Sequence, residues 1–494
     1  MARPGEESAG SAALAKAGLF VGPTLFVVLR ILPAPTGLGA EAWAAAAVVV
    51  LMAVWWFTQA IPLGATALLP ALLFPILGVA PLEKATAPYA HPLIFLFLGG
   101  FVLALTVERW NLHRRVAVLV IGVAGSGPGR LVAGFMAATA LLSMWVSNTA
   151  TTLMMVPIAT SVIAFVASGP TSSDMSPEGV ARRDGLARCL LLAVAYSASI
   201  GGLATLIGTP PNAFLAGYMS QRYGIEIGFG QWMLVGLPLS LVLLVLAWAL
   251  LTKVLFPLAG LDLGRVRVGL AAERAELGPL GRGEKMAAAL FAATALLWMV
   301  QPLVARVVPI GDTGIAILAA VAAFAVPVSL KERTFLMDWR GAARLPWEIL
   351  MLFGGGLSLA AAIDATGLAR WLGDMLGSAG GLPPFVFLLL ATGLVVFLTE
   401  LASNTATAAV FVPVAATLGG AAGLDPLPLA AAVALAASCA FMMPVATPPN
   451  AIVFAGGQLA VVDMCRAGFL LNIAATLLIG ALAWGLIPLV FPGA

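Results

Sequence analysis

The sequence predicts an all-α polytopic membrane protein. Three observations carry this prediction. Of the 494 residues, 61% are hydrophobic and 10% are charged, long apolar runs recur along the chain, and the two halves of the chain repeat each other. An ordinary soluble domain carries about 25% charged residues. We expect 11 transmembrane helices plus two re-entrant hairpins, arranged after the first helix as two inverted-topology repeats of five spans each.

The composition excludes several classes of function. A soluble fold of this length could not cover so much apolar surface, which excludes a cytosolic enzyme, a nucleic-acid-binding protein and a disordered scaffold. The net charge of +3 is too small to imply an acidic partner. The three cysteines form no CxxC pair and are interpreted as apolar fillers, and two histidines cannot build a histidine-rich metal site.

The expected spans follow from apolar runs close to the length, about 20 residues, that crosses the hydrocarbon core. They fall near 17–33, 43–61, 63–80, 92–107, 187–219, 230–257, 286–305, 313–328, 346–364, 427–458 and 467–491. Two more apolar stretches, near 130–166 and 384–418, are interrupted in the middle. Non-helical backbone at this depth is tolerated only inside protein or beside a water-filled cavity. We therefore interpret both stretches as hairpins that enter and leave on the same side.

The basic residues predict the orientation in the cell inner membrane. With the N-terminus in the cytoplasm, all but five of the 25 Lys and Arg residues fall on the cytoplasmic side, as the positive-inside rule requires. The five exceptions are Arg30, Lys84, Arg222, Arg306 and Arg370. The C-terminus is then expected outside.

The chain repeats itself at fixed offsets. The segment SNTAT at 147–151 recurs at 403–407, an offset of 256, and the segment TPPNA at 209–213 recurs at 447–451, an offset of 238. The expected units are an N-terminal segment with the first span (1–40), a first repeat (41–258, with hairpin 130–166 and broken helix 187–219), a cytoplasmic linker (259–285) and a second repeat (286–494, with hairpin 384–418 and broken helix 427–458). Two units of five spans joined in series point in opposite directions, which is the pattern of secondary transporters.

Each SNTAT segment predicts the tip of its hairpin. One helix is expected to end near Ser147 or Ser403 and the next to begin near Thr149 or Thr405, because Ser, Asn and Thr favour helix N-caps over helix interiors. The ending helix presents free carbonyls, which suit a cation. The starting helix presents free N–H groups, which suit an anion.

Each TPPNA segment predicts a break in a transmembrane helix. Proline at the first helical position with threonine before it marks a new helix start. Pro210 and Pro448 also remove a backbone donor that a continuous helix would need. Thr209 and Thr447 are therefore expected to be caps, with freed carbonyls just before them.

The four motifs contain no Lys or Arg. An anion would be held by amides, hydroxyls and helix ends, and a cation bound beside it would supply the missing charge. Ligands that are all oxygen favour Na⁺ among common monovalent cations. A lone Ser-Asn-Thr is more often hydrogen-bond glue between helices, and a lone Pro-Pro is more often a kink. Repetition at matched positions favours a binding site over these structural interpretations.

Paired SNT motifs on opposed hairpins, each followed by a TPPN break, resemble the divalent anion/sodium symporter family. The resemblance covers nearly the whole chain after the first span. It implies Na⁺ as the coupling ion, no organic cofactor and a small dicarboxylate as the transported molecule. The implied Na⁺ ligands are Ser143, Ser147, Asn148 and Gly208 at one site and Thr399, Ala402, Asn404 and Ala446 at the other. The implied substrate contacts are Asn148, Thr149, Thr209, Pro210, Ser403, Asn404, Thr405, Thr447 and Pro448.

The same resemblance implies a homodimer with an elevator mechanism, in which a rigid unit carrying both hairpins slides past a dimeric scaffold. Residues near 109–124 and 366–379 would be the lateral arm helices that join the two parts. The implied substrates are C4 dicarboxylates such as succinate, or citrate or sulfate, and the sequence does not choose among them.

Alternatives remain open at this point. A Na⁺-independent dicarboxylate exchanger would have the same fold, although the hydroxyl residues Ser143 and Thr399 favour symport. An intramembrane enzyme needs a nucleophile with a base, paired carboxylates or a metal set, so we predict that the chain is not an enzyme. A channel is disfavoured because closed hairpin tips favour alternating access. Glu400, where the first half has Met144, is either a functional carboxylate or a structural partner of a hydroxyl or amide.

Overall fold

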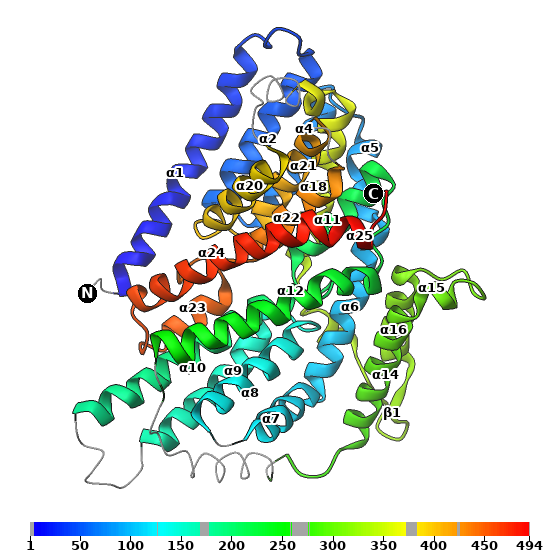
Figure 1. The fold of residues 1–494 in the computed structure, drawn as a ribbon. Helices are drawn as coiled ribbons and strands as arrows, with labels where there is room; N and C mark the ends of the chain where they lie inside the picture. The colour runs from blue at the N-terminus through cyan, green and yellow to red at the C-terminus, as the bar shows by residue number, and fades with distance from the viewer. Residues whose placement is uncertain are drawn as a thin grey trace.

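The computed structural model describes residues 4–125, 127–167, 177–256, 258, 275, 277–371, 383–421 and 425–493. Within these ranges eight helices are long and apolar enough to cross a membrane, and four shorter apolar helical segments accompany them. Figure 1 shows the arrangement. The chain is an all-helical polytopic membrane protein. The described residues also contain one small pair of strands.

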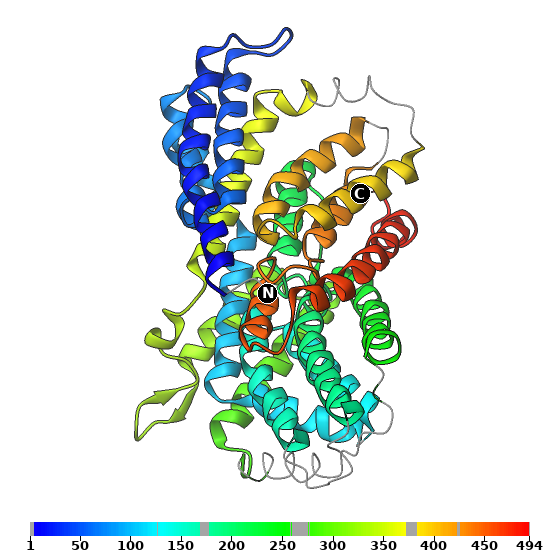
Figure 2. The same ribbon diagram turned by 90° about the vertical axis from the view of Figure 1, so that its left-hand side faces the viewer.

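One set of helices, here called the flank group, stands along one side of the molecule (Figure 2). Its first part comprises α1 (Pro4–Ile31), α2 (Ala40–Thr58), α3 (Leu63–Thr66), α4 (Leu69–Ile76), α5 (Leu82–Thr86), η1 (Ala87–Ala90) and α6 (Pro92–Arg109). Its second part comprises α14 (Arg282–Met299), α15 (Gln301–Val304), α16 (Asp312–Ala325), β1 (Pro327–Ser329), β2 (Thr334–Phe335), α17 (Trp339–Ala342) and α18 (Trp347–Ala365). The two parts interlock, since α6 packs against α16 while α18 packs against α3.

The remaining helices, here called the site group, carry all four motifs. Its first part comprises α8 (Pro128–Ser143), α9 (Asn148–Ala167), α10 (Pro177–Gly202), α11 (Pro210–Tyr223), α12 (Phe229–Ala249) and the π-helical turn η2 (Leu250–Leu255). Its second part comprises α20 (Pro384–Leu398), α21 (Asn404–Ala421), α22 (Pro426–Ala437), α23 (Pro448–Ala455), α24 (Val461–Gly485) and α25 (Ile487–Val490). The helix pairs α8–α9 and α20–α21 lie toward opposite ends of the molecule (Figure 2).

Both expected interruptions are present, although the first helix of each pair ends earlier than predicted. α8 ends at Ser143 and α20 at Leu398, several residues before the expected Ser147 and Ser403. At the first tip the backbone tightens, because Trp145 N donates to Leu142 O at 3.0 Å in the i→i+3 pattern of a terminal turn.

Three predicted spans are shorter or more broken than expected. The run 63–80 forms two short helices, α3 and α4, and the run 286–305 is divided between α14 and α15. The run 313–328 ends as a helix at Ala325, because Pro327 has no N–H with which to continue it. There the chain forms the antiparallel strands β1 and β2 instead.

Glycines allow the two halves of the flank group to approach closely. A side chain at Gly99 on α6 would overlap the backbone of Ala316 on α16, and a side chain at Gly355 on α18 would overlap the carbonyl of Ala67. Gly99 and Gly355 occupy the same position in the repeat, at the offset of 256. The same close crossing is therefore built twice.

One of the two expected arm segments lies in the described part of the chain. The helix α7 (Leu112–Ala124) follows α6 and packs along α8. Its Arg115 binds Glu284 at the start of α14, with a 3.0 Å contact between Nε and Oε1. Most of the second expected arm, near 366–379, lies outside the described residues.

A polar contact ties the end of α6 to the loop before α17. Arg109 pairs with Asp338 at 2.7 Å. The backbone N–H of Gly341, together with this guanidinium, holds the pKa of Asp338 below its usual range.

Candidate functional site

The first hairpin tip holds a cluster of three oxygen atoms. Ser143 Oγ lies 2.6 Å from Asn148 Oδ1 and 2.7 Å from the backbone oxygen of Ala198 on α10. A serine hydroxyl has one proton, so it can donate to only one of these acceptors at a time. A cluster with more lone pairs than protons is an environment that suits a cation.

The second tip repeats this geometry with different residues. Thr399 Oγ1 lies 3.0 Å from Asn404 Oδ1 and 2.9 Å from the backbone oxygen of Ala437 on α22. Both threonine and asparagine follow from the first tip at the offset of 256. The structure therefore brings together the predicted pair Ser143 and Asn148, and the predicted pair Thr399 and Asn404.

Gly208, another predicted ligand, also lies beside the first cluster. A Cβ atom at Gly202 would stand 2.8 Å from Asn148 Oδ1 and 2.9 Å from the carbonyl oxygen of Gly208. Both oxygens therefore approach the same glycine. This approach needs the absence of a side chain at Gly202, which the sequence motifs did not single out.

The other predicted cation ligands have plainer surroundings. The Ser147 hydroxyl accepts from Ala150 N at 3.3 Å and caps α9. Ala402 N donates to Thr399 O at 3.3 Å within the second tip, and Ala446 is buried in the break before α23. All three residues offer only a backbone or hydroxyl oxygen to an ion.

Two buried asparagines bond to backbone carbonyls within the breaks, and the sequence analysis gave them no role. Asn212 Nδ2 donates to the carbonyl of Thr205 at 2.9 Å, and Asn450 Nδ2 donates to that of Met443 at 3.0 Å. These carbonyls are freed because α10 and α22 stop short of α11 and α23. The signal that could have found them is the asparagine shared by both TPPNA segments.

The two breaks meet at the centre of the site group. Thr209 Oγ1 lies 3.1 Å from Ser438 Oγ, across the two repeats. The helix α23 packs against α9 and α10, while α11 packs against α21 and α22. The two tips and the two breaks are therefore neighbours in one place.

The predicted substrate residues divide by exposure. Asn148, Thr149, Ser403, Asn404 and Thr405 are partly exposed at the tips. Pro210 and Pro448 take the first helical positions that were predicted. The Thr447 side chain caps α23 by accepting from Asn450 N, but the Thr209 side chain makes no cap bond because its hydroxyl contacts Ser438.

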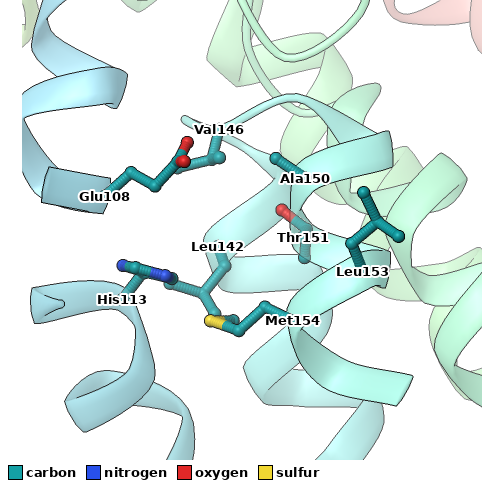
Figure 3. Close-up of a pocket in the computed structure, with 8 residues that line it drawn as sticks. All are labelled: Glu108, His113, Leu142, Val146, Ala150, Thr151, Leu153 and Met154. Atoms are coloured by element: carbon teal, nitrogen blue, oxygen red, sulfur yellow. The ribbon is translucent and has the colours of Figure 1, made fainter. Parts of the chain in front are cut away.

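A second pair of equivalent residues has unused hydrogen-bonding capacity. The hydroxyls of Thr151 and Thr407, the last residues of the two SNTAT segments, are buried and have no hydrogen-bond partner among the described residues. Thr151 lines a cavity of about 260 Å³ between the hairpin and the junction of α6 with α7. Figure 3 shows Glu108 and His113 on one side of this cavity and Thr151 on the other.

The two tips differ in how they meet the flank group. Trp145 at the first tip stacks near Trp298 on α14, with ring centroids 6.5 Å apart, and lies edge-on to Phe291 at 5.0 Å. Its repeat equivalent at the second tip is Leu401, which is 70% exposed. In this structure an aromatic contact docks the first tip on the flank group, and the described part of the chain shows no such contact for Leu401.

Charged metal ligands are not gathered here. Among the described residues, no group of three or more His, Cys, Asp or Glu side chains could hold a metal ion. A cation at either tip would therefore be held by neutral hydroxyl, amide and carbonyl oxygens.

Comparisons with known proteins identify the family of the chain. A family model described as the sodium:sulfate symporter transmembrane region matches residues 15–490. A protein of Staphylococcus saprophyticus, named sodium-dependent dicarboxylate transporter SdcS, is 40% identical over 95% of this chain and 91% of its own length. The protein of the same name from Staphylococcus aureus is 39% identical over 96% of this chain and 91% of its own length.

Solved structures share the fold at low sequence identity. The Alcanivorax borkumensis YdaH transporter matches with a TM-score of 0.56 at 14% identity, over 90% of this chain and 99% of its own. Neisseria gonorrhoeae MtrF matches with a TM-score of 0.55 at 14% identity, over 93% and 96% of the two chains. This likeness concerns the fold alone.

Proposed function

Since the chain belongs to the sodium:sulfate symporter family, we propose that it imports a C4 dicarboxylate such as succinate, coupled to Na⁺. Membership in a transporter family also agrees with the prediction that the chain is not an enzyme. The observation that carries the proposal is the oxygen cluster at each tip, where two acceptor oxygens lie within hydrogen-bond distance of a hydroxyl that has only one proton to donate. The relatives named as sodium-dependent dicarboxylate transporters support the choice of cation and anion.

In this proposal one Na⁺ binds at each tip. The first would be held by Ser143, Ser147, Asn148 and Gly208, and the second by Thr399, Ala402, Asn404 and Ala446. The helices α8 and α10 end beside the first site and α20 and α22 end beside the second, and the free carbonyls of a helix C-terminus stabilise positive charge.

The anion would bind between the two tips, beside the two ions. Its carboxylates would meet Asn148, Thr149, Ser403, Asn404 and Thr405, next to the helix starts at Thr209-Pro210 and Thr447-Pro448. The first N–H groups of α9 and α21 favour negative charge there. Because each asparagine serves an ion and the anion together, neither binds well without the other, and this couples their transport.

The membrane topology is part of the proposal. We assign 11 spans to α1, α2, α3–α4, α6, α10–α11, α12, α14, α16, α18, α22–α23 and α24, with α8–α9 and α20–α21 as re-entrant hairpins from opposite sides. The N-terminus would be cytoplasmic and the C-terminus outside, as the distribution of Lys and Arg predicts. The site group would be the moving body of an elevator and the flank group its scaffold, in a homodimer, as the family resemblance implies.

The decisive experiment is uptake of radiolabelled succinate into proteoliposomes. We expect uptake into empty vesicles under an inward Na⁺ gradient and none under a matched K⁺ gradient. Uptake that ignores Na⁺ but needs internal succinate would instead establish an exchanger and remove both cation sites. If succinate is not taken up, citrate and sulfate are the next substrates to test under the same gradients.

An ion pair between the two groups provides a test of the elevator. Arg222 at the end of α11 pairs with Asp364 at the end of α18, at 2.7 Å. If the site group slides, these residues must separate. With Cys465→Ser as background, bridging Arg222→Cys to Asp364→Cys with a short thiol cross-linker should stop uptake, and cleaving the bridge should restore it.

A matched pair within the site group is the control. Arg188 on α10 pairs with Asp463 on α24 at 3.5 Å. Bridging Arg188→Cys to Asp463→Cys should leave uptake intact, because both residues would move together. Full uptake with the Arg222–Asp364 bridge closed would exclude a sliding motion between α11 and α18.

A further inference from the structure

The carboxylate of Glu400 is buried at the second tip and has no basic partner among the described residues. Glu400 follows Thr399 directly and is 3% exposed. None of the ion pairs found among the described residues includes it. A buried charge without an opposite charge is stable only if hydrogen-bond donors surround it.

Four N–H donors meet this carboxylate. Oε1 accepts from Phe441 N at 2.7 Å, from Met442 N at 2.9 Å and from Asn472 Nδ2 at 2.7 Å, while Oε2 accepts from Met443 N at 2.9 Å. Residues 441–443 lie in the break between α22 and α23, and Asn472 lies on α24. One side chain therefore joins the hairpin tip, the break and a supporting helix.

The first repeat makes the same connection in another way. There the equivalent of Glu400 is Met144, whose backbone oxygen accepts from Thr205 Oγ1 at 2.5 Å, and the same hydroxyl accepts from Gly208 N at 3.0 Å. The equivalent of Thr205 in the second repeat is Met443, which has no hydroxyl. In the first repeat a side chain of the break, Thr205, bonds to the tip. In the second repeat a side chain of the tip, Glu400, bonds to the break.

The supporting helices are equivalent as well. Gly236 on α12 lies against the backbone of Leu203, and Gly468 on α24 lies against the backbone of Phe441. Four residues further along each helix stand Ser240, whose Oγ donates to Ile200 O at 2.6 Å, and Asn472, which donates to Glu400. Asn472 therefore occupies a position whose counterpart, Ser240, bonds to the last turn of α10, directly before the first break.

We infer that Glu400 is a positioning residue for the second cation site, and that Asn472 orients its carboxylate. Glu400 holds residues 441–443 of the break, the segment that also carries the Ala446 carbonyl, in place relative to Thr399 and Asn404. It also adds a negative charge beside this site that the first repeat lacks. The inference rests on the proposed function, because it assigns Glu400 to a Na⁺ site of that function.

The test is Glu400→Gln. Its amide group would set an N–H₂ donor against backbone N–H donors, so residues 441–443 of the break would no longer be held. We expect the Na⁺ concentration for half-maximal succinate uptake to rise about tenfold, the effect of losing a hydrogen bond to a charged group. The succinate concentration for half-maximal uptake, measured at saturating Na⁺, should change less than about twofold.

Three variants separate positioning from general stability. Glu400→Asp keeps the charge and should recover part of the Na⁺ affinity. Asn472→Ala should give a smaller shift, and combining it with Glu400→Gln should add little, as expected for residues that act as a unit. Thr392→Val is the matched control on α20 and should leave the Na⁺ dependence unchanged. Among the described residues, the buried Thr392 hydroxyl bonds only to Leu388 O of its own helix.

Stabilisation of the purified protein by Na⁺ gives a readout that needs no transport. The wild type should unfold at a higher temperature in Na⁺ than in K⁺, and Glu400→Gln should need more Na⁺ for the same rise. If the wild type responds and Glu400→Gln responds at the same Na⁺ concentrations, the inference is wrong while the proposed function stands. If the wild type shows neither Na⁺-dependent stabilisation nor Na⁺-dependent uptake, the proposed function fails first and this inference falls with it.

If Glu400→Gln does not fold, Glu400→Asp and Asn472→Ala decide the matter. A shift in the Na⁺ dependence of either, with Thr392→Val unchanged, supports the inference. An equal loss of maximal uptake in Asn472→Ala and Thr392→Val, with no shift in Na⁺ dependence, overturns it.

Discussion

Replacing Asn148 or Asn404 by alanine is expected to reduce Na⁺-driven uptake by at least about 100-fold. In each tip the asparagine oxygen faces the hydroxyl of Ser143 or Thr399, at 2.6 and 3.0 Å. In the proposed mechanism the same side chain also meets the substrate. A lost hydrogen bond to a charged group costs about 1.5–3 kcal/mol. Each variant would lose such contacts to both an ion and the anion, so the effects compound.

Uptake at increasing Na⁺ and succinate would measure this loss, with Thr160→Ala and Thr417→Ala as controls. Within the described part of the chain, those hydroxyls bond only to Pro157 O and Pro413 O of their own helices, α9 and α21. The controls should keep the uptake of the wild type. Either asparagine variant with normal Na⁺-dependent uptake would remove its tip from the binding site.

Much of this site could be predicted from the sequence because the chain contains it twice. A single Ser-Asn-Thr or Pro-Pro has several structural explanations, whereas two copies at fixed offsets share one geometric requirement. The pairing of residue 143 with 148 and of 399 with 404 was implied by the family resemblance, and the structure brings both pairs together within single hairpins. The helix starts at Pro210 and Pro448 follow from the restrictions of proline alone.

What could not be predicted depends on contacts between segments far apart in the chain. Ser143 meets Ala198, and Thr209 meets Ser438, through packing of separate helices. No periodicity in the sequence encodes these contacts. The hydrogen bonds of Glu400 could not be predicted either, because most of its partners are backbone N–H groups, which every residue except proline has.

The short segments were mispredicted for a related reason. The apolar content of a segment predicts that it lies in the membrane, but it does not predict whether the segment is one continuous helix. The run 63–80 was therefore predicted as one span, although it forms the two helices α3 and α4. Pro62 directly precedes α3 and Pro70 lies in the first turn of α4, so each marks a new helix start. Packing against α18 keeps these short pieces in place, and that contact is visible only in three dimensions.

The two repeats differ at position 202, where the first has a glycine, and substituting this glycine is expected to have the second large effect on uptake. Its equivalent in the second repeat is Ala440, and the equivalent of Gly208 is Ala446. A methyl group is therefore tolerated in one break, while in the other it would stand 2.8 Å from Asn148 Oδ1. A Cβ at Gly208 would be 2.5 Å from the carbonyl oxygen of Gly202. The first break is the tighter of the two.

We expect Gly202→Ala to lower Na⁺-dependent uptake by about 10- to 100-fold, because overpacking of a tight site costs about 1–3 kcal/mol and here displaces an ion ligand. Gly208→Ala should act in the same direction. The control Gly122→Ala, which has open space around it, and the reciprocal change Ala440→Gly should keep most of the uptake. The loss should appear as a raised Na⁺ requirement in the thermal shift of purified protein as well as in uptake. If Gly202→Ala binds and couples Na⁺ normally, the Asn148 oxygen and the Gly208 carbonyl do not share an ion, and the first cation site must be placed elsewhere.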